Sequence, residues 1–280
     1  MSVAELRVAY HHKLCAQVLS ADKGAPNIAD ISSPISKAIA QNLVDQFGVS
    51  LATKAPSGQT AGRLFEQLTT EFLEESFKLV QRLRPGKWLF SVKDISQFEQ
   101  YEHLAYLQHV LREQPKLRAA LGGDYLITPD ITIGRYPVAD SEINQDAVVV
   151  GDAEPICQYT PLRAVNRNAS SLILHASISC KWTVRSDRAQ NIRTEGLNLI
   201  RNRKGRTPHI VAVTAEPLPS RLASLALGTG DLDCVYHFAL PELRTAVEKA
   251  GGPDQAEMLS AMIDGRRLRD ISDLPLDLAI

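Results

Sequence analysis

The sequence is short of the features that mark secreted, membrane and disordered proteins. Its 280 residues contain four cysteines and no CxxC pair, which excludes a disulfide scaffold and predicts a reduced, cytoplasmic protein with its thiols mostly in the core. The longest uncharged apolar stretches, such as His209–Ala215, fall far short of the roughly 18 residues that a membrane span needs. The first residues, Met1–Arg7, lack the basic and then apolar run of a signal peptide. A 44% share of hydrophobic residues excludes disorder and predicts a globular protein with a sizeable core.

A strong excess of charge is also missing from the chain as a whole, because its formal net charge is −1. The charge is unevenly distributed, however. The stretch from Lys181 to Arg206 holds eight basic and two acidic residues, so it carries +6 and the rest of the chain −7. A local basic patch of this kind can follow a phosphate backbone, although a solvated helix face explains the charge alone equally well.

The apolar pattern predicts an α/β fold with a mixed central sheet flanked by helices. Apolar residues recur at spacings of three and four in the segments 61–83, 94–121 and 186–201, which predicts helices. Alternation predicts strands at 125–133 and 172–184, and short apolar runs predict buried strands at 209–215 and 234–240. No linker or repeat divides the chain. We therefore expect one domain, 1–280, with a helical N-terminal portion at 1–55.

Four charged residues lie where the local pattern predicts strands or buried faces. Asp130 follows Pro129 within a predicted strand, and Lys181 lies on the polar face of the next long strand. Glu195 interrupts the apolar stripe of the following helix, and Glu66 shares the inward stripe of the helix at 61–83. A buried charge is costly unless it is paired or bound to a metal. Taken singly, each residue fits a structural ion pair; together they suit a divalent cation beside an activated water.

The spacing of these residues resembles a known nuclease pattern. Pro129-Asp130, fifty residues, Lys181, thirteen residues and then Glu195 is similar to the rearranged PD-(D/E)xK motif, in which the second carboxylate comes from the following helix. Ser179 occupies the position two residues before the lysine, where the usual motif has an acid. This form is typical of NgoMIV-like type IIF restriction endonucleases, which recognise sites with a CCGG core. The resemblance covers the chain from about Pro56 to its end, and it is carried by Asp124–Asp130, Leu174–Thr183, Arg185–Gln190 and Asp270–Leu278.

The resemblance implies a restriction-endonuclease-like core and a Mg²⁺-dependent reaction. Asp130 and the main-chain carbonyl of Cys180 would hold the metal. Lys181 would orient the attacking water, and Glu195 and Glu66 would adjust the metal through inner- or outer-shell water.

A second group of residues suits base recognition. Arg185, Asp187 and Arg188 cluster where the strand that ends near Lys181 passes into its helix. Arginine binds guanine O6 and N7, and aspartate accepts a hydrogen bond from cytosine N4. From the residues alone, Asp187 equally fits a helix cap and the arginines fit phosphate contacts.

The resemblance assigns these three residues to the CCGG core. It also assigns Arg221 to the outer base pair and Gln59 to a minor-groove contact. The implied site is GCCGGC, cut after the first G to leave four-base 5′ overhangs.

The partners implied are double-stranded DNA, a homotetramer built from two dimers, and a cognate DNA methyltransferase that protects the host. No membrane partner is expected. Two alternatives stay open: a structure-selective or nicking repair nuclease with the same core, and a catalytically silent DNA-binding protein. The combination of Asp130, Lys181 and Glu195 argues against the silent protein, because unpaired buried charges destabilise a fold that does not use them.

Overall fold

The computed structural model describes residues 1–22, 24–53, 55–91, 94–121, 128–151, 156–166, 172–228 and 230–280. The chain divides into two compact units. Unit 1 comprises Met1–Arg84, Ile178–Gly196 and Ile210–Ile280, and unit 2 comprises Pro85–Ser177 and Leu197–His209. The expectation that they act as one endonuclease domain stays a prediction.

Eight short strands are described. Six of them form one sheet in the order β3-β4-β5-β6-β7-β8, and β1 and β2 form a separate hairpin. The β3–β4 pair is antiparallel, whereas β6–β7 and β7–β8 are parallel, so the sheet is mixed. The strands are β1 (Ala21–Asp22), β2 (Ala25–Pro26), β3 (Trp88–Phe90), β4 (Ile131–Arg135), β5 (Ile173–Lys181), β6 (His209–Thr214), β7 (Cys234–His237) and β8 (Leu268–Asp270).

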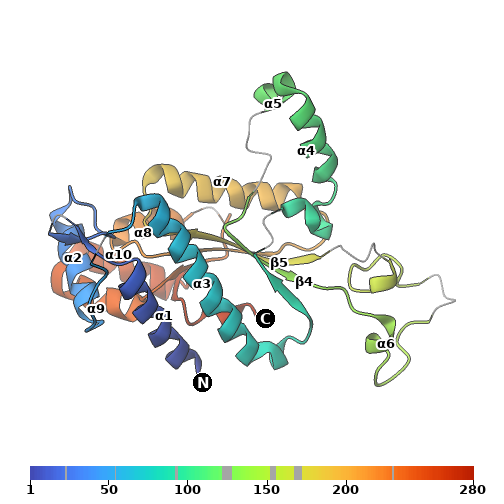
Figure 1. Ribbon diagram of the computed structural model, residues 1–280, viewed down its shortest axis with the longest axis horizontal. Helices are drawn as coiled ribbons and strands as arrows, with labels where there is room; N and C mark the ends of the chain where they lie inside the picture. The colour runs from blue at the N-terminus through green and yellow to red at the C-terminus, as the bar shows by residue number, and fades with distance from the viewer. Residues whose placement is uncertain are drawn as a thin grey trace. The chain divides into compact units, whose positions relative to one another are not determined.

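Helices flank these strands, which confirms the predicted fold class (Figure 1). Several begin at a capping serine: the Ser2 hydroxyl accepts a hydrogen bond from the Glu5 amide, and the Ser57 hydroxyl accepts one from Thr60. The helices are α1 (Val3–Gln17), α2 (Pro34–Asp45), α3 (Gly58–Val80), α4 (Leu104–Glu113), α5 (Pro115–Leu121), α6 (Asp140–Ile143), α7 (Ser186–Asn202), α8 (Pro219–Ala226), α9 (Leu240–Ala250), α10 (Pro253–Asp264) and α11 (Leu274–Asp277), with 3₁₀ turns at Gln81–Leu83, Ile95–Gln97, Glu99–Tyr101 and Ala164–Asn166.

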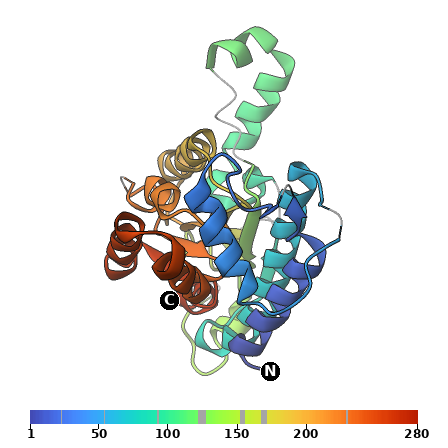
Figure 2. The same ribbon diagram turned by 90° about the vertical axis from the view of Figure 1, so that its left-hand side faces the viewer.

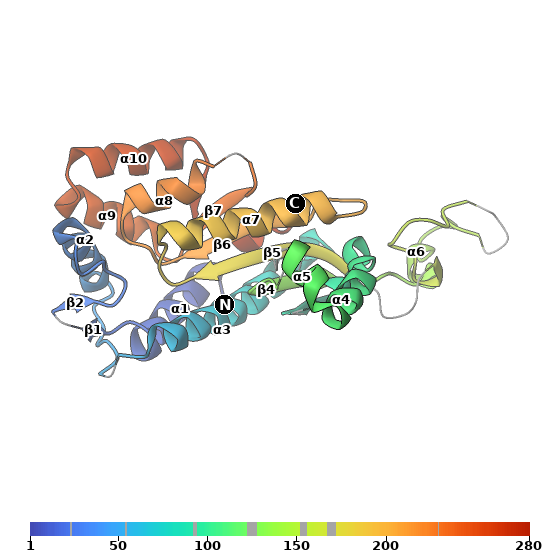
Figure 3. The same ribbon diagram turned by 90° about the horizontal axis from the view of Figure 1, so that it is seen from above.

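Within unit 1 the helices pack in pairs. α1 lies along α3 (Figure 1), and α2 packs against α9 on the side that faces the viewer in Figure 2. α8 packs against α10 (Figure 3). Apolar side chains fill these contacts; Leu14, Phe65 and Leu73 are fully buried.

Three predictions about the elements need correction. The helix expected at 94–121 is divided into 3₁₀ turns, α4 and α5; the break between α4 and α5 occurs because Pro115 lacks an amide donor and keeps Gln114 out of the helical region. The strand β3 was not expected, since three residues are too few to show alternation. Asp130 lies in a bend directly before β4 and not in mid-strand. The part of the expected strand at 125–127 lies outside the described residues.

The polar face of β5 is also different from the expectation. His175, Ser177 and Ser179 are all buried, so both faces of this strand are covered. A strand in the interior of a sheet with helices on both sides is shielded from water on each face.

The cysteines behave as the sequence predicted. Cys15, Cys180 and Cys234 are buried and Cys157 is exposed, so the thiols lie mostly in the core. In the part of the chain that the structure describes, no helix is both long enough and apolar enough to cross a bilayer.

Candidate active site and DNA-reading segments

The end of β5 is fixed against α3. Lys181 is the last residue of β5 and is half-buried. The Cys180 thiol lies 3.7 Å from the Thr69 hydroxyl on α3, and the Trp182 ring meets the Phe65 ring edge-on, with 5.1 Å between centroids. Both neighbours of Lys181 therefore contact the same helix, which limits the positions that the lysine can take.

Glu195 reaches this strand from α7, which lies alongside β5 (Figure 3). The Ser179 hydroxyl donates a hydrogen bond to Glu195 Oε2 across 3.3 Å. Ala189, Ile192 and Leu199 are buried on the same helix, so the carboxylate belongs to the inward face as predicted. The acid that the usual motif would place at position 179 is thus replaced, in space, by a carboxylate from the helix.

Gly196, next to Glu195, brings α7 close to the loop before β7. A Cβ at this position would lie 2.5 Å from the backbone oxygen of Asp231, so no larger residue fits without a shift. The Arg193 Nε donates to Asp231 Oδ2 across 2.9 Å, and Asp231 is buried. These two contacts fix the helix turn that carries Glu195.

The other two predicted acids are placed differently. Glu66 is half-buried on α3, on a stripe with the buried Leu73 and Phe77, as expected. Asp130 is half-buried and belongs to unit 2, whereas Lys181, Glu195 and Glu66 belong to unit 1. The convergence of Asp130 with the other three stays a prediction. Among the residues that the structure describes, no group of three or more His, Cys, Asp or Glu side chains is arranged to hold a metal ion.

The start of α7 presents the predicted core-reading residues. The Arg185 carbonyl accepts from the Ala189 amide across 2.9 Å, so Arg185 holds the N-cap position and Asp187 lies in the first turn. The interpretation of Asp187 as the cap is therefore wrong. Arg185 and Asp187 are exposed, and the half-buried Arg188 donates to the carbonyl and the hydroxyl of Thr183 across 3.1 and 3.2 Å. Two of the three side chains face solvent, and the third is held against the preceding turn.

Arg221 is the third residue of α8 and is held by two acids. Its Nη2 forms an ion pair with Asp30, and its Nη1 lies 3.9 Å from Glu216 Oε2. Hydrogen bonds from the Ser32 side chain and amide, together with Arg221, lower the pKa of Asp30 to about 2, so this acid is ionised near neutral pH. Gln59 is exposed at the second position of α3.

Sequence reasoning missed Asp30 and Glu216. One signal for Glu216 was available, since a carboxylate directly follows the strand expected at 209–215. Nothing in the local pattern marks Asp30, whose partner is 191 residues away in the chain.

Comparison with known proteins decides the family. The NgoMIV restriction enzyme family matches residues 10–280. The type II restriction enzyme NgoMIV of Neisseria gonorrhoeae is 47% identical over 285 aligned positions, which cover 99% of this chain and 98% of that protein. The chain belongs to the NgoMIV restriction enzyme family. It is a type II restriction enzyme, a deoxyribonuclease that binds DNA.

The match to the NgoMIV restriction enzyme family is longer than the sequence motifs suggested. It begins at residue 10 and not near Pro56, so it includes most of the N-terminal portion that was expected to match poorly. A solved complex of the PspGI restriction endonuclease with substrate DNA is 16% identical and covers 93% of this chain and 96% of that chain; its TM-score of 0.26 is too low to support an argument.

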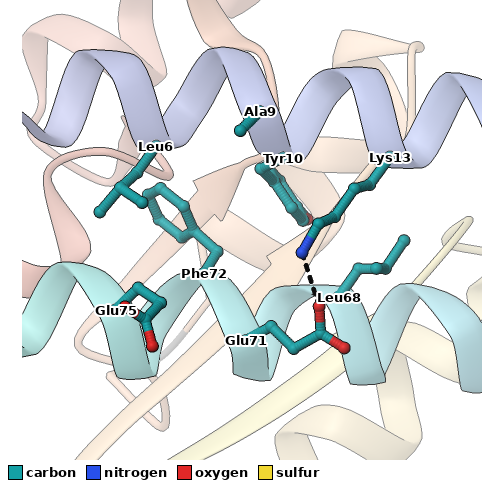
Figure 4. Close-up of a pocket in the computed structure, with 8 residues that line it drawn as sticks. All are labelled: Leu6, Ala9, Tyr10, Lys13, Leu68, Glu71, Phe72 and Glu75. Carbon is teal, nitrogen blue, oxygen red and sulfur yellow. Dashed lines mark hydrogen bonds and ion pairs between the residues drawn. The ribbon is translucent and has the colours of Figure 1, made fainter. Parts of the chain in front are cut away.

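One cavity lies between α1 and α3, away from the predicted NgoMIV-family site residues (Figure 4). Leu68, Glu71 and Phe72 line it from α3, and Lys13 Nζ from α1 pairs with Glu71 Oε2 across 2.9 Å. The 100° turn per residue places this face of α3 opposite Glu66. The helix therefore packs on α1 with one face and carries Glu66 on the other.

Proposed function

We propose that this restriction enzyme hydrolyses double-stranded DNA at a palindrome with a CCGG core. The proposed site is GCCGGC, cut after the first G, which leaves 5′-CCGG overhangs with 5′-phosphate and 3′-hydroxyl ends. The observation that carries the proposal is the position of Arg185 and Asp187, exposed at the start of the helix that also supplies Glu195. One helix thus links the residues proposed to read bases with a residue proposed for the reaction.

The side chains at the start of α7 suit G·C pairs. Two arginines can each donate two hydrogen bonds to guanine O6 and N7, and one aspartate can accept from cytosine N4. A half-site of CCGG contains only G·C pairs, so this set matches its donors and acceptors. Arg221 is proposed to read the outer pair, and Gln59, exposed at the start of α3, to contact the minor groove.

Asp130 and the Cys180 main-chain carbonyl are the proposed ligands of Mg²⁺. Both supply oxygen, which Mg²⁺ prefers, and the Cys180 thiol contacts Thr69 instead. Mg²⁺ usually keeps several waters and needs one or two protein carboxylates, so a cluster of three protein acids is not required. When bound, the metal would lower the pKa of a water and neutralise developing charge.

The remaining residues are proposed to orient the attacking water and to balance charge. Lys181, fixed between two residues that contact α3, would direct the attacking water and balance charge on the phosphate. Glu195, accepting from Ser179, and Glu66 would bind the metal's waters. Attack in line with the departing 3′-oxygen breaks the P–O3′ bond and leaves the phosphate on the 5′ end.

A palindromic site calls for a two-fold dimer, in which each subunit reads one half-site. Two such dimers are proposed to form a homotetramer that binds two sites, acts in the cytoplasm and coexists with a protective methyltransferase. Exposed apolar side chains in one stretch of unit 2 support an assembly surface: Val148, Val149, Ile156, Tyr159 and Val165.

Digestion of plasmids tests the specificity and the cofactor together. Plasmids with one and with two GCCGGC sites are incubated with Mg²⁺ or with EDTA. Discrete fragments that need Mg²⁺, produced faster from the two-site plasmid, are the expected result. If the fragments end at another CCGG-containing sequence, the proposed role of Arg221 is wrong and the rest of the proposal stands. No cutting by folded protein would favour the repair nuclease or the silent binding protein.

Substitution of Lys181 separates catalysis from binding. Lys181→Ala and Asp130→Ala should abolish cleavage and leave specific binding intact, because neither residue is proposed to read a base. Lys204→Ala removes an equivalent charge from an exposed position and is the matched control. Cleavage that survives Lys181→Ala would contradict the assignment.

A further inference from the structure

Glu216 is buried between the two segments proposed to read DNA. Ala215 separates Glu216 from the end of β6, and the Glu216 side chain is fully shielded from solvent. The segment that carries it runs beside the turn after Lys181, because the Ala215 amide donates to the Trp182 carbonyl across 3.2 Å. The Glu216 amide in turn donates to the Thr214 hydroxyl across 3.2 Å, which fixes its own backbone.

Each carboxylate oxygen of Glu216 accepts from a different segment. Oε2 accepts from the Val184 amide across 3.0 Å, and Val184 directly precedes Arg185. Oε1 accepts from the Leu218 amide across 3.2 Å, and Leu218 is the N-cap of α8, which carries Arg221. The Arg221 guanidinium lies 3.9 Å from Oε2. One side chain therefore contacts the backbone at the start of both reading helices and the side chain of one reader.

This set of contacts requires a carboxylate. An ionised glutamate accepts at both oxygens and donates at neither. A glutamine of the same shape has one acceptor and one donor group, so it can accept from Val184 or from Leu218 but not from both. Its amide would also direct N–H groups at a backbone donor or at Arg221. A buried carboxylate is costly by itself, and these partners are what stabilise it.

We infer that Glu216 is a positioning residue that couples recognition of the outer base pair to recognition of the CCGG core. It fixes the turn before Arg185 and the start of α8 relative to each other, while Asp30 holds the far side of Arg221. This inference rests on the proposed function, since it assigns both helices to base reading. It predicts that one substitution, at a residue that contacts no base, relaxes both parts of the site.

The test compares three DNA duplexes under single-turnover conditions with Mg²⁺: GCCGGC, the outer-pair variant ACCGGT and the core variant GCTAGC. The cleavage-rate ratio of GCCGGC to each variant measures discrimination at one part of the site. Glu216→Gln should lower both ratios by about tenfold or more, the size expected when a good base contact is lost. Arg221→Ala should lower only the outer-pair ratio.

Glu242→Gln is the matched control. Glu242 is a half-buried acid of the same unit, on α9, that pairs with Arg7. The Glu242→Gln substitution should leave both cleavage-rate ratios unchanged. If Glu216→Gln lowers the overall rate but leaves both ratios unchanged, Glu216 has a purely structural role. If only the outer-pair ratio falls, Glu216 acts through Arg221 only. Either result overturns the coupling.

A second measurement on the unmodified enzyme covers the case in which the variant does not fold. Burial raises the pKa of Glu216 to about 7, so acidification below neutral pH turns one oxygen into a donor. Arg221 and Asp30 also face this carboxyl, and Asp30, whose pKa is lowered to about 2, stays ionised over this range. His237 is neutral there, since burial lowers its pKa to about 4.

Both ratios should therefore fall together as the pH drops from 8 to 6, and constant ratios would contradict the inference. Failure of the proposed function is a different result. If the proposed function is wrong, the unmodified enzyme does not cut GCCGGC at any pH, whereas failure of the coupling leaves that cleavage intact.

Discussion

Ser179 and Glu195 show how an acid that is missing from a sequence motif can be supplied by another part of the chain. The serine hydroxyl is a poor metal ligand, and it donates instead to the Glu195 carboxylate across 3.3 Å. The acid therefore stands beside the position that the usual motif fills from the strand. At the residue scale, the position of a carboxylate oxygen in space matters more than the element of the chain that supplies it.

Arg188 offers a test of base reading at the residue scale. Arg188→Ala should cost about 1–3 kcal/mol of discrimination at one core G·C pair, because a bidentate guanine contact is lost. Arg206→Ala, at an exposed position outside α7, is the control for a lost charge. Competition binding with the cognate duplex and single-substitution duplexes measures the change. Equal weakening on every sequence would identify Arg188 as a phosphate contact.

Glu216 should make stability depend on pH. Its pKa is about 7 in the folded protein because of burial, whereas a glutamate in an unfolded chain titrates near 4.3. Between these values the folded protein keeps a proton that the unfolded chain has released. The stabilisation is complete below the unfolded pKa and is lost as the pH rises through the folded one.

Urea unfolding of the unmodified protein and Glu216→Gln, from pH 4 to pH 8, measures this effect. The free energy of unfolding of the unmodified protein should fall relative to the variant by up to about 3 kcal/mol as the pH rises to 7. The comparison removes contributions from other acids. A difference that does not vary with pH would show that Glu216 does not titrate in this window.

At the scale of the element, α7 carries residues for both proposed tasks. Its first turn holds Asp187 and Arg188, and two turns later Glu195 accepts from Ser179. Gly196 and Arg193 fix the helix to the loop at Asp231. A shift of the helix would therefore move the proposed base readers and Glu195 together.

Gly196→Ala tests this close packing. The new methyl group would lie 2.5 Å from a backbone oxygen, so the helix must move, at a cost of about 1–3 kcal/mol. The roughly 1 kcal/mol that alanine gains over glycine in helix propensity offsets part of this cost, so we expect a net loss of about 1–2 kcal/mol of stability. Cleavage should slow as well, because Glu195 is adjacent.

Gln190→Ala, at an exposed position of the same helix, should change stability by less than about 0.5 kcal/mol. Urea unfolding and single-turnover cleavage measure both variants. A Gly196→Ala protein as stable and active as the unmodified one would show that α7 tolerates a larger distance from this loop.

At the scale of the whole molecule, charge and apolar surface are separated along the chain. The basic stretch from Lys181 to Arg206 carries +6 on a chain of net charge −1, which suits an enzyme that binds DNA without a generally basic surface. Unit 2 instead exposes apolar side chains between Val148 and Val165; Tyr159 is 91% exposed and Val148 87%. Large apolar side chains exposed to this degree are typical of residues that contact another protein.

The proposed tetramer can be tested at these apolar residues. The unmodified protein should sediment with four times the 30.8-kDa chain mass, and the double variant Val148→Ser, Tyr159→Ser with twice that mass. The dimeric variant should also lose its preference for the two-site plasmid. Val8→Ser, an exposed apolar position on α1, is the control. A tetramer that persists in the double variant would place the assembly surface elsewhere.

The sequence by itself predicted the longer elements, the fold class and the family. Alternation and apolar runs predicted β5, β6 and β7, and helical periodicity predicted α3 and α7, because burial imposes a period of 2 on strands and 3.6 on helices. The spacing of Asp130, Lys181 and Glu195 predicted the family, which the comparisons confirm. Short elements such as β3 carry too few residues to show a period.

Only the tertiary structure decided which side chains meet. The pairs Ser179–Glu195 and Asp30–Arg221, and the contact of Glu216 with the Val184 amide before α7, join residues from 16 to 191 positions apart. Local periodicity states which face of an element is buried, but it does not state what lies against that face. That choice depends on how helices and strands pack, since burial, charge pairing and hydrogen bonding must be satisfied at once by residues from separate parts of the chain.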